Sequence, residues 1–194
     1  MKIVIINYGA GNIQSIKFAI KRLGYEAVLS DNVAEIKAAD KVIFPGVGEA
    51  SSAMKKLRDS KLDVIIPDLK QPVLGICLGM QLMCHSSEEG NTQGLGIFDV
   101  DVKKFSNKVK VPQIGWNQIT DLKTSLFKGI PEKEHIYLVH SYYAPICPET
   151  IAVSEYDVPY SAALQKNNFY GTQFHPEKSS MIGEAILKNF IEII

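Results

Sequence analysis

Short apolar runs alternate with segments of helical periodicity through the first half of the chain. The runs 2–6, 26–29, 41–44 and 73–76 are rich in Ile, Val and Leu and have the length of buried strands. Between them, apolar residues recur at helical spacing, and Gly24 ends the first such segment as a C-terminal glycine does. This alternation predicts an α/β fold with a doubly wound, mostly parallel sheet flanked by helices. The helices are expected around 13–23, 33–38, 50–57 and 78–84.

The second half of the chain is expected to add antiparallel strands. Residues 97–105 alternate as an exposed antiparallel strand does, and the polar segment before them, 85–96, is expected to be a surface loop. Residues 160–166 and 169–174 predict a hairpin about 167–168. Further strands are expected at 136–139 and 151–156, and a closing helix from about 179.

Composition adds limits to this picture. The 194 residues suit a single domain, 1–194, with a sizeable core. Lys plus Arg number 21, as do Asp plus Glu, so no net charge favours nucleic acid or a membrane surface. The apolar run 3–6 is too short for a signal peptide or a membrane span, and three cysteines without paired spacing do not suggest a disulfide framework. A cytoplasmic location is therefore expected.

The candidate nucleophile is Cys77, which falls between the strand at 73–76 and the helix that follows. Gly75 and Gly79 flank it at the spacing of a sharp strand-to-helix turn, as in a hydrolase nucleophile elbow. A helix N-terminus beside the sulfur favours the thiolate, which is the reactive form. A small buried cysteine in a glycine-rich turn is the alternative interpretation. The two glycines favour catalysis.

A second glycine-bearing loop, 45–48, follows the strand at 41–44. Its glycines free the backbone to direct N–H groups at a ligand, as an oxyanion hole requires, although a tight turn has the same composition. In a doubly wound sheet this loop and Cys77 both lie at carboxyl ends of strands, where ligands bind. The earlier glycine loop at 7–12 lacks the final glycine of a dinucleotide motif and the lysine of a P-loop, so it is a weak indication of phosphate binding.

His175 is the candidate general base, and Glu177 is its candidate carboxylate partner. Pro176 keeps His175 out of the helical conformation, and residues two apart in an extended run point to the same side. A carboxylate beside the imidazole fixes its tautomer and leaves the other ring nitrogen to exchange protons with a thiol. An exposed His-Pro-Glu turn is the alternative, and His140 competes for the role of base.

Two further features have a plain structural interpretation. The adjacent Glu88 and Glu89 are expected to form a solvated face rather than an acid–base pair. Trp116, the single tryptophan, is either a core residue or an anchor that faces a partner.

With these motifs identified, the chain resembles the class I, triad-type glutamine amidotransferases. The stretches 75–81 and 174–177 match that family's nucleophile and acid–base motifs. Within the family, the chain is most similar to the branch that serves histidine biosynthesis, through matches that run from end to end. The supporting stretches are 7–12, 45–48, 115–117, 139–143 and 173–179.

The resemblance implies a role for each matching residue. Cys77 attacks the carboxamide carbon of glutamine, His175 transfers protons, and Glu177 orients His175. Ammonia leaves, and water then releases glutamate from a thioester. The residues expected to bind the oxyanion are Gly46, Val47, Gly48 and Leu78, and those expected to hold the substrate are Gln81, Ser141 and Tyr142.

The resemblance also implies a partner but no cofactor and no metal. Ammonia would pass to a cyclase subunit of TIM-barrel fold, in a heterodimer that makes imidazole glycerol phosphate and an aminoimidazole carboxamide ribotide. Asn12, Trp116 and Asn117 match the face turned toward that cyclase. The positions that depart from the family's usual residues, on the partner face and the oxyanion loop, are Asn7, Gln113, Glu49 and Ala50.

Two other functional classes are compatible with the fold. A γ-glutamyl peptidase, or the glutaminase of vitamin B6 synthesis, would use the same triad on another substrate or for another partner; the stretches 115–117 and 140–142 argue against both. A non-catalytic binding module would need no triad, and the intact Cys77, His175 and Glu177 argue against it.

Overall fold

The centre of the fold is a seven-stranded sheet. The computed structural model describes residues 1–9 and 11–194, so Ala10 of the 7–12 loop lies outside the described residues. The strands of this sheet are β1 (Ile3–Ile6), β2 (Ala27–Ser30), β3 (Lys41–Phe44), β4 (Val73–Ile76), β11 (Thr150–Glu155), β12 (Pro159–Lys166) and β13 (Phe169–Thr172). Their order is β11-β12-β13-β4-β3-β1-β2; every neighbouring pair from β13 to β2 is parallel, and β11 and β12 join antiparallel. The predicted mostly parallel sheet, with antiparallel strands added by the C-terminal half, is confirmed.

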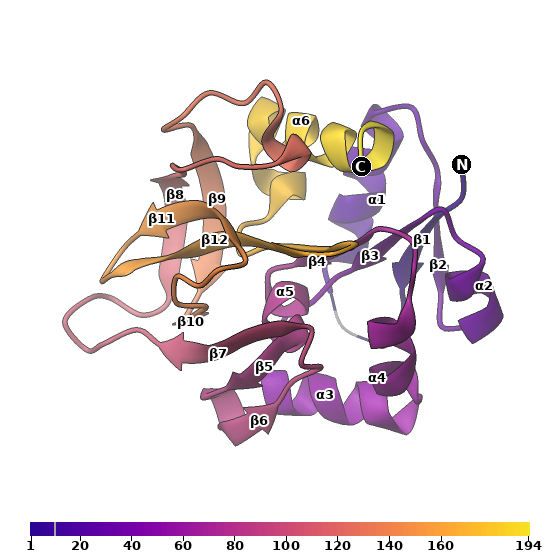
Figure 1. Cartoon of the computed structure of the whole chain (residues 1–194), viewed down its shortest axis with the longest axis horizontal. Helices are drawn as coiled ribbons and strands as arrows, with labels where there is room; N and C mark the ends of the chain where they lie inside the picture. Colours follow the sequence, from indigo (N-terminus) through magenta and orange to yellow (C-terminus); the bar gives the residue numbers. More distant parts are fainter. Residues whose placement is uncertain (10) are drawn as a thin grey trace.

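Helices cover both faces of this sheet, with α1 and α6 on one face and α3, α4 and α5 on the other (Figure 1). Strand β1 shows why both faces must be covered: Ile3 and Ile5 pack into one apolar cluster with α1 and α6, whereas Val4 and Ile6 pack into the other. None of the helices in the described part of the chain is long and apolar enough to cross a membrane. The helices are α1 (Ile13–Arg22), α2 (Val33–Lys37), α3 (Ala50–Asp59), α4 (Leu62–Ile65), α5 (Leu78–Met83) and α6 (Ser180–Glu192), with short 3-10 turns η1 (Ile66–Asp68), η2 (Glu89–Asn91), η3 (Ser125–Phe127) and η4 (Pro176–Lys178).

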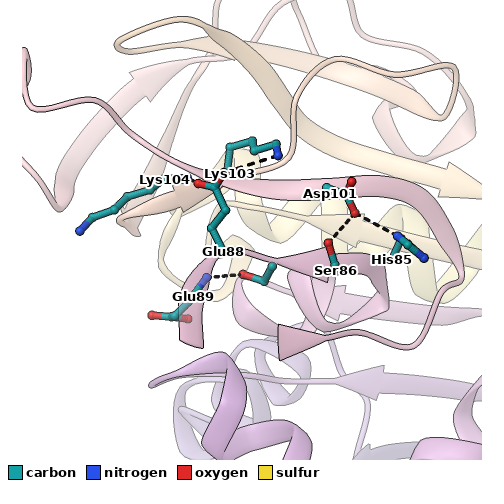
Figure 2. Close-up of polar contacts among 8 residues, drawn as sticks. His85, Ser86, Glu88, Glu89, Asp101, Lys103 and Lys104 are labelled. Atoms are coloured by element: carbon teal, nitrogen blue, oxygen red, sulfur yellow. Dashed lines mark hydrogen bonds and ion pairs between the residues drawn. The ribbon is translucent and has the colours of Figure 1, made fainter. Parts of the chain in front are cut away.

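The segment 85–96 corrects the sequence prediction in part, because residues 85–87 and 92–93 are strands rather than a surface loop. It belongs to a four-stranded sheet made of β5 (Cys84–Ser87), β6 (Thr92–Gln93), β7 (Phe98–Lys104) and β10 (Tyr142–Tyr143), in the order β10-β7-β5-β6. Strand β7, expected to be antiparallel, pairs parallel with β5 and antiparallel with β10. The His85 and Ser86 side chains of β5 both form hydrogen bonds with Asp101 of β7 (Figure 2). Because β5 and β6 are short and partly polar, their sequences show no clear strand periodicity, and pairing with distant strands forms them instead.

A two-stranded ribbon of β8 (Gln113–Gln118) and β9 (His135–His140) extends the fold beside α6 (Figure 1). The strand expected at 136–139 is present within β9, where burial alternates, with Ile136 and Leu138 inside and Tyr137 and Val139 half-buried. The ribbon matters for function because β9 ends at His140, beside the cavity that contains Cys77.

Candidate active site

Cys77 lies in a strained turn between β4 and α5. Its backbone has φ 53° and ψ −110°, a conformation that residues other than glycine rarely adopt. Two backbone hydrogen bonds hold it there: the Cys77 N–H donates to the Thr172 carbonyl at 2.7 Å, and the Gln81 N–H donates to the Cys77 carbonyl at 3.2 Å. The sharp turn expected from the glycine spacing is therefore present, and strain of this kind is concentrated at functional sites.

The glycines around Cys77 let three backbone segments touch. A methyl group on Gly79 would lie 2.0 Å from the Phe44 carbonyl oxygen at the end of β3, and one on Gly46 would lie 2.5 Å from the Gly79 nitrogen. A methyl group on Gly75 would lie 2.4 Å from the Met83 side chain. Close packing of this kind leaves no room for a Cβ, and it brings the 45–48 loop against the turn that carries Cys77.

A cavity of about 360 Å³ opens in front of the Cys77 side chain. Its volume falls in the range of small-molecule sites. Two of the predicted catalytic and oxyanion residues do not line this cavity. Gly46 packs behind the loop against Gly79, and Glu177 lies behind His175. The cavity brings together Val47, Gly48, Cys77, Leu78, Gln81, His140, Ser141, Tyr142 and His175, and its wall also includes Glu89, Pro112, Val139 and Lys178.

His175 and Glu177 form a buried pair. The His175 Nδ1 donates to Glu177 Oε1 at 2.8 Å, and the side chains are only 6% and 1% exposed. The expected extended run is only partly correct: His175 is extended, but Glu177 lies in the 3-10 turn η4. Ser179 holds this turn against β9, because its hydroxyl donates to the His175 carbonyl and accepts from the Tyr137 N–H.

The surroundings of His175 favour its protonated form. Burial lowers the pKa of His175, but interactions with the Cys77 and Glu177 side chains outweigh burial and raise it to about 10. Since Glu177 occupies Nδ1, the Nε2 atom is the one left to exchange a proton with sulfur or substrate. This arrangement suits a thiolate–imidazolium pair oriented by a carboxylate.

His140, the competing base, is held neutral. Its Nδ1 donates to the Tyr142 carbonyl at 2.7 Å, and its ring packs against Phe105 and Tyr160. Burial, with a smaller contribution from the nearby His175, lowers the pKa of His140 to about 4. An imidazole with this pKa is a weak base near neutral pH, so the geometry favours His175 for proton transfer.

Glu89 contradicts the expectation of a solvated Glu88–Glu89 face. Glu88 is exposed and pairs with Lys103, whereas Glu89 points away from that pair (Figure 2) and is half-buried. The Glu89 Oε2 accepts a hydrogen bond from the Ala50 N–H at the start of α3, and burial raises the pKa of its carboxyl. Its side chain therefore joins the exit of the 45–48 loop to the cavity wall, a contact with no signal in local sequence.

The candidate partner-facing residues lie outside the described cavity lining. Trp116 is 53% exposed, and among the aromatic pairs described it forms only a T-shaped contact with the Tyr137 ring, so a core role is wrong. Asn117 is tied to the fold by its side-chain amide, which donates to the Glu155 carbonyl at 2.6 Å. Asn12 precedes α1 and makes no side-chain cap hydrogen bond within the described structure.

Comparison with protein families identifies one match that spans nearly the whole chain. The model of the family described as glutamine amidotransferase class-I matches residues 4–194. The chain is 58% identical to the imidazole glycerol phosphate synthase subunit HisH of Bacteroides fragilis (strain YCH46), with 100% of both chains covered. It is 47% identical to the subunit of the same name from Yersinia pestis, again with 100% of both chains covered.

Solved structures share the fold at low sequence identity. A putative GMP synthase protein of Thermoplasma acidophilum superposes with a TM-score of 0.77 at 22% identity, covering 100% of this chain and 93% of that one. A structure described as a glutamine amidotransferase gives a TM-score of 0.76 at 18% identity, covering 98% of this chain and 97% of that one. At these identities the likeness concerns the fold alone.

Proposed function

We propose that this chain, which belongs to the class I glutamine amidotransferases, releases ammonia from glutamine. The ammonia would serve the synthesis of imidazole glycerol phosphate in histidine biosynthesis. The observation that carries the proposal is the strained Cys77 beside the buried His175–Glu177 pair in one cavity. Relatives named as subunits of imidazole glycerol phosphate synthase, at 47–58% identity over the full chain, support this branch of the family.

The chemistry proceeds through a thioester. The Cys77 thiolate attacks the carboxamide carbon of glutamine, and the negative charge moves to the carboxamide oxygen. When the carbon–nitrogen bond breaks, His175 gives its proton to the leaving ammonia, and Glu177 keeps the imidazole oriented throughout. His175 then takes a proton from water as the water attacks the thioester, which releases glutamate and restores Cys77.

The oxyanion would be held by backbone N–H groups. Leu78 starts the helix directly after Cys77, and Val47 and Gly48 face the same cavity. Donors fixed around a developing negative charge stabilise the transition state more than the substrate. Gly46, which packs behind the loop against Gly79, is proposed to support this arrangement.

The glutamine itself would be held at its amino-acid end. Gln81, Ser141 and Tyr142 line the cavity with polar groups, and the half-buried Glu89 carboxylate offers a counter-charge to an α-ammonium group. A zwitterionic ligand needs such a group, since a buried charge without a partner is costly.

The ammonia would be used by a separate cyclase subunit of TIM-barrel fold, in a heterodimer. We propose that Asn12, Trp116 and Asn117 face that subunit. The exposure of the Trp116 indole supports this, because large aromatic side chains on a surface are typical anchors of protein interfaces.

The test combines activity with labelling by a glutamine-like electrophile, in the complex with the matching cyclase. Cys77→Ala should lose both glutamine hydrolysis and labelling. Cys84→Ala and Cys147→Ala should keep both, because these thiols lie outside the described cavity lining. Labelling that survives Cys77→Ala would contradict the proposal. Turnover of γ-glutamyl peptides in place of glutamine would identify the peptidase alternative.

A further inference from the structure

Gln173 is a fully buried amide beside the candidate nucleophile, and the mechanism above gives it no role. It follows β13 directly, with its backbone N–H donating to the Ala162 carbonyl at 2.8 Å and its side chain 0% exposed. The side chain contacts two groups of the site, Gln81 and the Cys77 sulfur.

A backbone carbonyl fixes which way the two amides point. The Gln81 Nε2 donates to the Tyr142 carbonyl at 2.9 Å, and a carbonyl can only accept, so Gln81 must present its NH₂ group on this side. The same Nε2 donates to Gln173 Oε1 at 2.8 Å. Gln173 is therefore left with its NH₂ group facing Cys77, and the Nε2–Sγ distance is 3.8 Å.

The other neighbours of the sulfur show why a donor at this place matters. The Val139 carbonyl oxygen lies 3.7 Å from the Cys77 Sγ and can accept only from the protonated thiol. A carbonyl dipole directed at the sulfur favours the thiol, whereas an amide N–H favours the thiolate. Gln173 thus opposes Val139, and its orientation depends on Gln81, which lines the substrate cavity.

We propose that Gln173 is a positioning residue that donates an N–H to the Cys77 thiolate and couples it, through Gln81, to the substrate cavity. This proposal rests on the proposed function, in which Cys77 is the nucleophile. No atom of Gln173 needs to contact glutamine: its amide holds the sulfur in the anionic form and in place, while His175 carries the proton.

The test is the pH dependence of alkylation of Cys77 in the full chain, with iodoacetamide as the probe and peptide mapping to separate Cys77 from Cys84 and Cys147. Gln173→Leu should move the pH of half-maximal rate upward by about one unit, the size of effect expected from one lost hydrogen bond to a charged group. Gln173→Glu should move it further, because a carboxylate repels the thiolate.

The matched control is Thr172→Val, a substitution at the adjacent and equally buried residue. The Thr172 hydroxyl has no hydrogen-bond partner within the described structure, so its loss should leave the alkylation profile unchanged. If the Gln173 variants do not fold, Gln81→Met serves instead. It removes the amide that bonds both the Tyr142 carbonyl and Gln173 but leaves Gln173 itself in place, so it should shift the profile in the same direction by a smaller amount.

An unchanged profile in the folded Gln173 variants, or in Gln81→Met when those do not fold, would overturn this proposal. Alkylation requires no glutamine turnover, so the two proposals fail separately. An active glutaminase with unchanged profiles contradicts only the role of Gln173. If the Gln173 variants shift the alkylation profile but the native chain has no glutaminase activity, the proposed function is contradicted and the Gln173–Cys77 contact is still supported.

Discussion

Two histidines line one cavity and differ in charge because their side chains have different neighbours. The Nδ1 of His175 donates to a carboxylate, which stabilises the imidazolium, whereas the Nδ1 of His140 donates to a neutral carbonyl. Burial disfavours the charged form of both. The Cys77 side chain and the buried Glu177 carboxylate, which both interact with His175, therefore separate a proton-transfer residue from a neutral one.

Removal of the two members of the buried pair should have unequal effects. His175→Ala should lower glutamine hydrolysis by about 10³-fold or more, since the thiol loses its base and the leaving group its acid. Glu177→Gln should cost roughly one to two orders of magnitude less, because the carboxylate orients the imidazole without exchanging the proton itself. Steady-state kinetics in the cyclase complex measure both. An active His175→Ala beside an inactive His140→Ala would reverse the roles.

The neutral His140 predicts a loss of stability at acidic pH. Its pKa is about 4 in the fold, against about 6.5 in the unfolded chain, so between these values the unfolded chain takes up a proton that the folded chain refuses. The contribution is intact above pH 6.5 and is lost as the pH falls toward 4, by about 3 kcal/mol in total.

Urea unfolding at pH 7, 5.5 and 4 measures this effect. Between pH 7 and pH 4 the free energy of unfolding of His140→Gln should fall by about 3 kcal/mol less than that of the native chain, whatever the stability of the variant at pH 7. His135→Gln is the control, because His135 is exposed at the other end of β9. Equal pH slopes for the native chain and His140→Gln would contradict the argument.

At the level of elements, close packing between α6 and η4 positions the His175–Glu177 pair. A methyl group on Gly183 would lie 2.0 Å from the Pro176 carbonyl oxygen and 2.8 Å from the Ser179 Cβ. The first turns of α6 therefore rest directly on the backbone of the turn that carries Glu177. Position 183 requires glycine because the helix and the turn are too close to leave room for a Cβ, and α6 thereby supports the turn that carries Glu177.

Gly183→Ala should displace η4 and lower both stability and activity. Overpacking of this kind costs about 1–3 kcal/mol, and the shift of Glu177 should reduce glutamine hydrolysis in the fraction that remains folded. Urea unfolding and kinetics on the same samples separate the two effects. Lys188→Ala, an exposed substitution on α6, should change stability by less than about 0.5 kcal/mol. Native activity in a folded Gly183→Ala would show that the turn tolerates the displacement.

At the level of the whole molecule, the cavity is assembled from segments that are far apart in sequence. The 45–48 loop, the Cys77 turn and the His175 turn follow β3, β4 and β13, which are neighbours in the sheet and run parallel, so their carboxyl ends meet at one edge. Because the sheet joins strands from both ends of the chain, we propose that residues 1–194 form one domain.

The 45–48 loop predicts that the partner switches the enzyme on. Gly46 and Gly48 flank Val47, and a peptide between glycines can take more than one orientation, of which only one directs an N–H at the oxyanion. The isolated chain should hydrolyse glutamine slowly, and the cyclase with its ribonucleotide ligand should raise the rate by about 10² to 10³-fold, the usual effect of one oxyanion donor.

Three rate measurements test this switch: the isolated chain, the complex, and the complex with the ligand. The partner can favour one loop arrangement only by binding it more tightly, so the ligand should also strengthen association of the two chains. Equal rates in all three states would mean that the loop is fixed before the partner binds.

The sequence by itself determined the features that depend on local backbone chemistry. Glycine spacing around Cys77, the proline after His175 and the alternation of apolar runs with helical periodicity each restrict φ, ψ or burial over a few residues, so the turn, the His175–Glu177 contact and the parallel sheet were all predictable.

Only the tertiary structure decided the features that depend on contacts between distant segments. The strand pairing of 84–87, the burial of Glu89 against α3, the neutral state of His140 and the amide of Gln173 at the sulfur each arise from groups many residues away. Burial and hydrogen-bond partners set charge and orientation, and a local pattern does not contain them.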